Sequence, residues 1–243
     1  MKFALIGHPV AGSLSPRLFQ AAYGGRYPYH LIDEPAFETA WARFLASYDG
    51  INVTAPFKQD AFARVGSLSA DARRTGAVNL VVRRGPETVG YNTDVDGVLG
   101  AVRETGLPVS RALIVGAGGA ARAAAVATLR LGCQVGIANR TFSKAEALAD
   151  ALGCRALSLA DAAALAPDLV VYTVPGGLAV PGLTGDLLCG AVVLEAEYKH
   201  PALSRVPCRA YVDGRRWLLW QAVAGYALFT GEEPDAEKMS AAL

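Results

Sequence analysis

The sequence predicts an α/β protein of two domains with a cleft between them, the second domain a doubly wound parallel sheet. Short apolar runs alternate with longer segments of helical period along the chain, a pattern typical of parallel strands joined by helices. A glycine-rich turn at residues 116–121 follows one such run and opens a helix. The character of the chain also changes after Gly106-Leu107-Pro108, where we expect a domain boundary and hence a ligand site between the halves.

In the first half, apolar runs predict the strands and amphipathic runs predict the helices. The expected strands are residues 2–6, 27–32, 51–53, 77–83 and 89–91, the last two forming a hairpin around Gly85-Pro86. The expected helices are residues 16–23 (opened by Ser15), 36–46, 58–64 and 94–105 (capped by Thr93 or Asp94).

The second half repeats the alternation with more strongly apolar strands. The expected strands are residues 111–115, 134–138, 169–173, 191–195 and 210–212, and the expected helices are 120–131, 142–152, 217–230 and 235–243. We expect the terminal helix to fold back on the first half. The domains are therefore expected to be 1–105 plus 214–243 and 106–213.

Composition excludes several classes of protein. The chain has 243 residues, of which 52% are hydrophobic and 19% charged, enough for a substantial core. Its 23 basic and 22 acidic residues leave a net charge of +1, so we expect no nucleic acid and no membrane among its partners. Four cysteines without a CxxC pair predict reduced thiols and no metal site. With no signal-peptide pattern, a cytoplasmic location is expected. The expected partner is a small-molecule substrate, and the expected oligomeric state is a monomer or homodimer.

The glycine-rich turn predicts a dinucleotide site of the Rossmann type, since it has the G-x-G-x-x-G/A spacing between a strand and a helix. Gly116 permits a tight turn, Gly118 lets the backbone approach a pyrophosphate, and Ala121 keeps helix and strand close. The helix N-terminus offers its free N–H groups to the phosphates. The residues expected to bind the dinucleotide here are Gly116, Ala117, Gly118, Gly119 and Ala120.

The next strand indicates which dinucleotide is bound. An NAD site places a carboxylate there for the ribose 2′-hydroxyl, whereas this chain has Asn139, Arg140 and Thr141, followed by Lys144. A guanidinium, a hydroxyl and an ammonium suit a 2′-phosphate. The cofactor is therefore expected to be NADP(H), with a solvated basic corner at a helix start as the alternative.

Two ionisable residues in the first half are candidates for catalysis. Lys58 lies just beyond a strand and a proline turn, and Asp94 opens the helix that leads into the nucleotide half. Taken alone, such a pair is more often a solvated ion pair.

Several ordered motifs resemble those of the shikimate dehydrogenase family over nearly the whole chain. Residues 7–16 resemble its S-x-S-P segment, 52–58 its N-V-T-x-P-x-K, 76–79 its G-A-V-N, 90–97 its G-x-N-T-D-x-x-G, 139–141 its NADP signature, and Gly214 with Gln221 its terminal G-x6-Q.

This resemblance implies the reversible NADPH-dependent reduction of 3-dehydroshikimate to shikimate. It implies that Ser13 and Ser15 bind the substrate carboxylate and that Lys58 and Asp94 flank the reacting C–O group as an acid–base pair. The other residues implied in binding are Thr54, Asn79 and Gln221 for ring hydroxyls, Tyr198 near the nicotinamide, and Gly214 for the cofactor.

The chain departs from the family pattern at a few places. Gly12 stands where the family has histidine, Arg215-Arg216-Trp217 replaces small or aliphatic residues, and Pro201 follows Tyr198 one residue later than in Y-x-P. Two alternatives therefore stay open: a paralogue acting on quinate or another cyclic hydroxy acid, and a non-catalytic NADP(H)-binding sensor.

Overall fold

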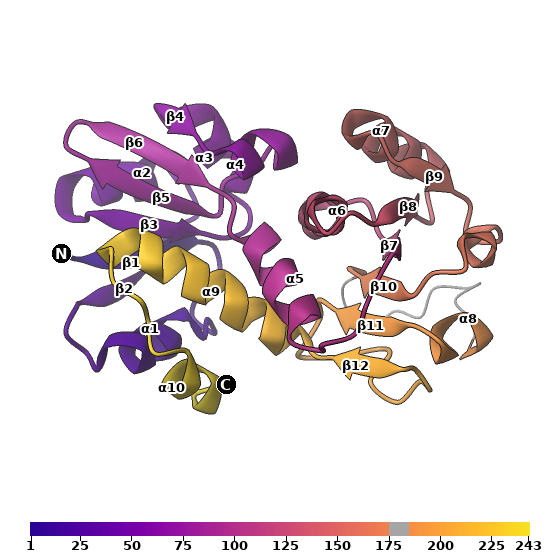
Figure 1. Ribbon diagram of the computed structural model, residues 1–243. Coiled ribbons are helices and arrows are strands. Elements are labelled where there is room, and N and C mark those ends of the chain that lie inside the picture. The colour runs from indigo at the N-terminus through magenta and orange to yellow at the C-terminus, as the bar shows by residue number, and fades with distance from the viewer. Residues whose placement is uncertain (175–184) are drawn as a thin grey trace. The chain divides into compact units, whose positions relative to one another are not determined.

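The computed structural model describes residues 1–174 and 185–243 and divides into two compact units (Figure 1). Unit 1 comprises Met1–Thr93 with Gln221–Leu243, and unit 2 comprises Asp94–Trp220. Residues 94–105 and 214–220, which the sequence analysis assigns to the first domain, thus group with unit 2. The reason is apolar packing, because the side chains of the helix after Thr93 are buried in the core of unit 2.

Unit 1 is built on a six-stranded sheet in the order β2-β1-β3-β5-β6-β4. Its strands are β1 (Phe3–Gly7), β2 (Tyr29–Asp33), β3 (Gly50–Val53), β4 (Ser67–Leu68), β5 (Leu80–Arg84) and β6 (Glu87–Tyr91). β1 pairs in parallel with β2 and β3, whereas β5 runs antiparallel to both of its neighbours. The hairpin expected around Gly85-Pro86 is therefore confirmed as β5–β6.

Helices cover both faces of this sheet. They are α1 (Ser15–Tyr23), α2 (Phe37–Ser47), α3 (Lys58–Arg64), α4 (Ala70–Thr75), α10 (Ala236–Ala241) and the second part of α9 (Gly214–Thr230). On one side, Trp41 and Phe44 of α2 pack with Ile51. In an aromatic cluster, the Phe3 ring lies 5.4 Å from that of Phe19 and stacks on that of Phe229 at 4.7 Å. This stacking brings the C-terminal part of α9 onto the N-terminal strand.

Unit 2 is built on a six-stranded sheet in the order β12-β11-β10-β7-β8-β9, and each strand runs parallel to its neighbours. Its strands are β7 (Arg111–Val115), β8 (Gln134–Ala138), β9 (Arg155–Leu157), β10 (Leu169–Tyr172), β11 (Val192–Glu195) and β12 (Ala210–Val212). Counted from β7, this is the 3-2-1-4-5-6 order of a Rossmann fold. The expected doubly wound parallel sheet is confirmed.

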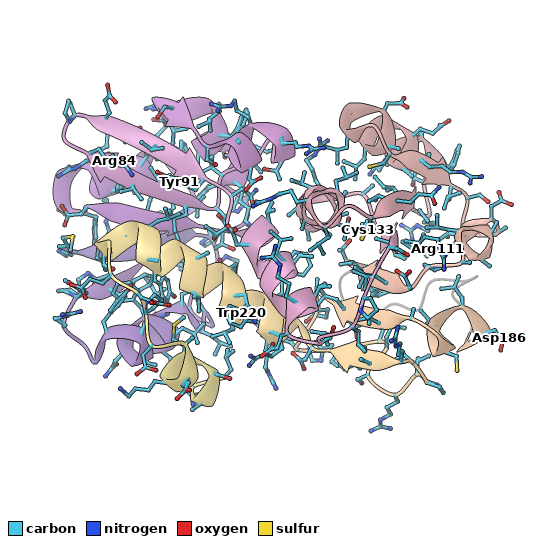
Figure 2. All side chains as sticks on the ribbon, in the orientation of Figure 1. Arg84, Tyr91, Arg111, Cys133, Asp186 and Trp220 are labelled. Carbon is cyan, nitrogen blue, oxygen red and sulfur yellow. The ribbon has the colours of Figure 1, made fainter. Side chains whose placement is uncertain are left out.

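The sheet of unit 2 has a separate apolar cluster on each face. One cluster includes buried residues of α5 (Asp94–Arg103), α6 (Gly119–Arg130) and α7 (Phe142–Leu152), together with Trp217 of α9. The other includes residues of η1 (Ala162–Leu165) and α8 (Gly185–Cys189). Trp220, labelled in Figure 2, lies directly over Gly100, where an added Cβ would come within 2.4 Å of its ring. α5 and α9 can therefore pack this closely only because residue 100 has no side chain.

Five short elements were not expected from the sequence: β4, α4, β9, η1 and α8. Conversely, α9 begins at Gly214, three residues before the expected start. Within residues 1–174 and 185–243, no helix is both long and apolar enough to cross a membrane.

Candidate functional site

The glycine turn after β7 depends on the absence of a side chain at Gly116. This residue has φ of 119°, and an added Cβ would lie 2.2 Å from Thr173 Oγ1. The Thr173 hydroxyl itself donates to the carbonyl oxygen of Val115 at 2.8 Å. Thr173 follows β10, the neighbour of β7, so the turn lies at the point where the strand order reverses, where such sheets bind their ligands. Thr173 was not expected from the sequence to have a role, although its place at the end of a strand could have indicated one.

The N-terminus of α6 presents backbone amides. Its N-cap residue is Gly118, and no side chain caps the helix. Gly118 and Gly119 are both exposed. Because the first N–H groups of a helix lack partners within it, this terminus is suited to a phosphate.

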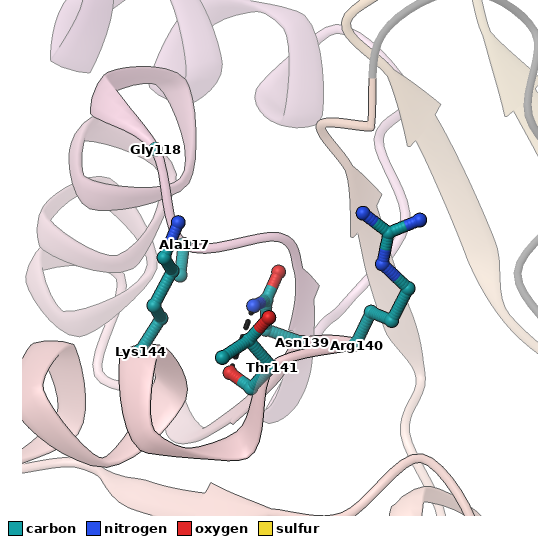
Figure 3. Close-up of a pocket in the computed structure, with 6 residues that line it drawn as sticks. All are labelled: Ala117, Gly118, Asn139, Arg140, Thr141 and Lys144. Atoms are coloured by element: carbon teal, nitrogen blue, oxygen red, sulfur yellow. Dashed lines mark hydrogen bonds between the residues drawn. The ribbon is translucent and has the colours of Figure 1, made fainter.

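A pocket of about 220 Å³ lies beside this terminus (Figure 3). The residues that line it are Ala117, Gly118, Asn139, Arg140, Thr141 and Lys144. The Asn139 side-chain amide donates to the carbonyl oxygen of Thr141 at 2.9 Å, which fixes the turn into α7. Figure 3 shows Lys144 extending from α7 toward Ala117, whereas Arg140 points away from it. Two cations and a hydroxyl at the mouth of one pocket fit a phosphorylated ribose.

Four residues expected at the cofactor are not among those that line that pocket: Gly116, Gly119, Ala120 and Gly214. Gly214 begins α9, where an added Cβ would come within 2.4 Å of the carbonyl oxygen of Ala196 and 2.7 Å of that of Glu195. Close packing of backbone thus accounts for glycine at this position. Its contact with a cofactor stays a prediction.

In unit 1, a polar cluster joins Asn79, Thr93 and Gln221. The Asn79 amide donates to Thr93 Oγ1 at 3.1 Å, and Asn79 Oδ1 accepts the Thr93 backbone N–H at 2.8 Å. Gln221 Oε1 lies 3.5 Å from the Asn79 amide nitrogen and 3.4 Å from Thr93 Oγ1. Asn79 and Thr93 are almost fully buried. From the sequence, Thr93 was expected only as a helix cap. In the structure it contacts both Asn79 and Gln221, two of the residues expected to bind the substrate.

The two expected carboxylate-binding serines lie together at the start of α1. Ser13 Oγ is 3.2 Å from Ser15 Oγ and accepts the Ser15 backbone N–H at the same distance. The Tyr226 hydroxyl of α9 donates to the Ser15 carbonyl oxygen at 3.0 Å. Thr54 lies against Gly7, where an added Cβ would come within 2.4 Å of Thr54 Cγ2. These contacts hold the serine loop and the β3 end in fixed places within unit 1.

Lys58 and Asp94 each begin a helix, and both are half-buried. The Lys58 carbonyl oxygen accepts the backbone N–H of Val78 at 3.0 Å, so its main chain is tied to the residue before Asn79. Asp94 follows Thr93 directly in the chain. Each of the two ionisable residues thus adjoins the polar cluster through its backbone or its sequence neighbour.

Tyr198 is half-buried in the segment after β11. Burial raises the pKa of its phenol and the Glu197 carboxylate acts in the same direction, whereas the Arg215 guanidinium opposes them. The other two departures at this helix start are accounted for locally, because Arg216 Nε donates to Glu104 Oε2 at 2.7 Å and Trp217 is buried in the core.

Within the described ranges, no group of three or more His, Cys, Asp or Glu side chains could hold a metal ion. His8, the histidine closest to Gly12, pairs with Asp33 through a 2.7 Å contact and lowers the pKa of that carboxyl.

Comparison with known proteins covers the whole chain. Residues 5–81 match the family described as shikimate dehydrogenase substrate binding domain, and residues 101–173 match shikimate / quinate 5-dehydrogenase. A shikimate dehydrogenase (NADP(+)) of Rubrobacter xylanophilus is 41% identical, with 98% of this chain and 94% of that protein covered. One of Thermus thermophilus is 36% identical, with 100% and 97% covered.

Solved structures agree. The crystal structure of a Thermus thermophilus shikimate 5-dehydrogenase in complex with NADP(H) and shikimate superimposes with a TM-score of 0.91 at 33% identity, covering 100% of this chain and 98% of that one. A quinate dehydrogenase from Corynebacterium glutamicum in complex with NAD gives a TM-score of 0.87 at 28% identity, with 100% and 97% covered. On this evidence from sequence and fold together, the chain belongs to the shikimate dehydrogenase family.

Proposed function

We propose that this chain catalyses the reversible NADPH-dependent reduction of 3-dehydroshikimate to shikimate. The observation that carries the proposal is the polar cluster of buried Asn79 and Thr93 with half-buried Gln221, in the unit that matches a substrate-binding domain. A side-chain amide has two N–H donors and an oxygen with two acceptor sites, so Asn79 and Gln221 are suited to bind the hydroxyls of a small cyclic acid in addition to their contacts with Thr93.

Ser13 and Ser15 are proposed to bind the substrate carboxylate. Both hydroxyls lie at the start of α1, 3.2 Å apart, and a carboxylate accepts hydrogen bonds through two oxygens. Thr54, Asn79 and Gln221 are proposed to bind ring hydroxyls, with Thr93 holding the Asn79 amide in orientation. Tyr198 is proposed to lie near the nicotinamide.

The NADP(H) phosphates are proposed to bind the N-terminus of α6 and the pocket beside it. Gly118 supplies unblocked backbone there, while Arg140, Thr141 and Lys144 suit the 2′-phosphate. When bound, the coenzyme supplies a hydride to the substrate carbonyl carbon.

Lys58 is proposed as the proton donor. Hydride addition leaves negative charge on the former carbonyl oxygen, and an ammonium group there polarises the carbonyl and donates a proton as the charge forms. In the reverse direction the neutral amine takes the proton back. Asp94 is proposed to assist by accepting a hydrogen bond from a neighbouring substrate hydroxyl.

A coupled assay tests the function. Purified protein is mixed with NADP⁺ or NAD⁺ and with shikimate or quinate, and NADPH or NADH absorbance is followed. Turnover fastest with shikimate and NADP⁺ supports the proposal. Coenzyme binding without turnover of either acid would contradict it and favour a sensor.

Quinate is the second candidate substrate. One matching family description names both acids, and a similar structure is that of a quinate dehydrogenase with NAD. Since Asn139, Arg140 and Thr141 contain no carboxylate for a free 2′-hydroxyl, we rank NADP-dependent shikimate oxidation first.

We further propose that the chain works as a monomer or homodimer in the cytoplasm. All four cysteines are free thiols in the structure, which supports a reducing compartment. Light scattering of the purified protein measures its mass in solution, and a larger assembly would contradict the proposal.

A further inference from the structure

Glu195, the last residue of β11, is a fully buried carboxylate that none of the steps above uses. Its Oε1 accepts the backbone N–H of Ala202 at 2.6 Å. Its Oε2 accepts the backbone N–H of Leu203 at 3.0 Å and the Tyr211 hydroxyl at 2.9 Å. Each of these three hydrogen bonds is accepted by one of the two carboxylate oxygens. Burial and the bond to Glu195 also raise the pKa of Tyr211.

These bonds close the segment of residues 196–203, which carries Tyr198. The near end is fixed where the Ala196 backbone N–H donates to the Tyr172 carbonyl oxygen at 2.8 Å. In the middle, Glu197 Oε1 accepts the backbone N–H of Lys199 at 2.7 Å. The far end, Ala202 and Leu203, is held by the Glu195 side chain. One carboxylate at the strand end therefore brings the segment back to the sheet.

The length of this segment makes such an anchor important. Pro201 follows Tyr198 one residue later than in the family motif Y-x-P, so this chain has an additional residue to order. Each added loop residue enlarges the set of conformations that folding must exclude. Without acceptors at position 195, the N–H groups of half-buried Ala202 and buried Leu203 would lose these partners, an unfavourable arrangement that the segment would relieve by opening.

We propose that Glu195 is a positioning residue for the dehydrogenase reaction: it fixes the segment 196–203 and thereby the place of Tyr198, the residue expected near the nicotinamide. This inference rests on the proposed function for its kinetic consequences. Its structural consequence, the ordering of residues 196–203, is independent of any ligand.

The test replaces the carboxylate by an amide of equal size, Glu195→Gln. An amide turns one acceptor into a donor, so at least one of the three bonds is lost. We expect faster amide hydrogen exchange in peptides covering residues 196–203. Because a displacement of about 1 Å near the chemistry can cost about a hundredfold, we expect kcat/KM for shikimate to fall about tenfold to a hundredfold. The affinity for NADPH, measured by the fluorescence of the coenzyme, is determined separately from turnover.

Asp168→Asn is the matched control. Asp168 also accepts three hydrogen bonds, from the backbone N–H groups of Ser110 (2.8 Å) and Arg111 (2.9 Å) and from the Ser110 hydroxyl (2.6 Å). It precedes β10, however, and so lies at the amino ends of the parallel strands, whereas Glu195 lies at their carboxyl ends. This variant should lose thermal stability while keeping kcat/KM within about twofold, as expected for a structural substitution remote from the site. Tyr211→Phe, which removes one donor and leaves the carboxylate, should give an intermediate effect if Glu195→Gln fails to fold.

The inference is overturned if exchange in residues 196–203 is unchanged in Glu195→Gln and Tyr211→Phe, or if their loss of kcat/KM does not exceed that of Asp168→Asn. Failure of the proposed function gives a different result, in which the wild-type protein oxidises neither acid with either coenzyme. In that case amide hydrogen exchange in residues 196–203 still decides whether Glu195 orders the segment.

Discussion

The Asn79 carboxamide and Thr93 bind each other through both ends of the amide: Nδ2 to the Thr93 hydroxyl at 3.1 Å and Oδ1 to the Thr93 backbone N–H at 2.8 Å. This double contact fixes the orientation of the amide, with its nitrogen toward the Thr93 hydroxyl and its oxygen toward the Thr93 backbone N–H. Gln221, from the far end of the chain, completes the group.

Asn79→Leu should therefore reduce both stability and activity. The substitution leaves the buried Thr93 N–H without its acceptor, which costs about 1–3 kcal/mol of unfolding free energy. We expect a lower kcat/KM for shikimate at an unchanged KM for NADP⁺. Urea denaturation and steady-state kinetics measure the two effects. An unchanged KM and kcat for shikimate would remove Asn79 from the substrate site.

Lys58→Ala should cut kcat by about 10²–10⁴-fold, the usual scale of general acid–base catalysis, with much less effect on KM. Lys238→Ala is the control, because Lys238 is exposed and pairs with Asp235 at 2.7 Å within α10. Steady-state rates with saturating shikimate and NADP⁺ measure the difference. Turnover like that of the wild type in Lys58→Ala would refute its assignment as proton donor.

Arg140→Ala and Lys144→Ala should each weaken the preference for NADP⁺. A hydrogen bond to a charged group is worth about 1.5–3 kcal/mol, which corresponds to about a tenfold to a hundredfold rise in the KM for NADP⁺. The KM for NAD⁺ should change little, since NAD⁺ lacks the 2′-phosphate. Equal effects on both coenzymes would show that these side chains do not contact that phosphate.

Gly116→Ala should destabilise unit 2 and weaken NADPH binding, because the added methyl meets Thr173 Oγ1 at 2.2 Å and the backbone has φ of 119°. Gly132→Ala separates the two causes, since Gly132 has φ of 80° with no atom near an added Cβ. That control should cost only the left-handed conformation, about 1–2 kcal/mol. Thermal unfolding with and without NADPH compares them. Equal losses of stability and equal NADPH affinity would contradict the steric argument.

Glu104→Gln should show a pH-dependent loss of stability. Its hydrogen bond with Arg216 holds the pKa of the Glu104 carboxyl below its ordinary value of 4.5. A lowered pKa stabilises the fold fully above the unfolded value, and the contribution disappears as pH falls through the folded one. The difference in unfolding free energy between wild type and variant should thus be present at neutral pH and vanish in acid. Denaturation curves at a series of pH values measure it, and a gap that widens in acid would contradict the pairing.

The main elements were predictable because their patterns are long and local. β7, α6 and β8 follow from two apolar runs joined by a glycine turn, and each was expected within one or two residues. The missed elements are short: β9 has three residues, and α4 is the polar hexamer 70–75 with only Ala72 and Thr75 buried. Such segments are held by tertiary contacts rather than by their own periodicity.

The site was predictable in composition but not in its contacts. Ser13 and Ser15 lie close together in the chain, and their proximity in space follows from that. Gln221 reaches Asn79 across 142 residues, a contact that no local pattern encodes. Glu195 was missed because its sequence context, a carboxylate ending an apolar run, does not distinguish a buried acceptor from a solvated strand end.

Trp220 and Gln221 are consecutive residues of α9 with different contacts. The Trp220 indole packs over Gly100, and the Gln221 amide lies against Asn79 and Thr93. Each residue of an α-helix advances the direction of its side chain by about 100°. A single insertion or deletion between Trp217 and Trp220 would turn both groups by about 100° if the start of the helix stayed fixed. If the end of the helix stayed fixed instead, it would turn Trp217 away from the core. The number of residues between Trp217 and Trp220 is therefore constrained as well as their types.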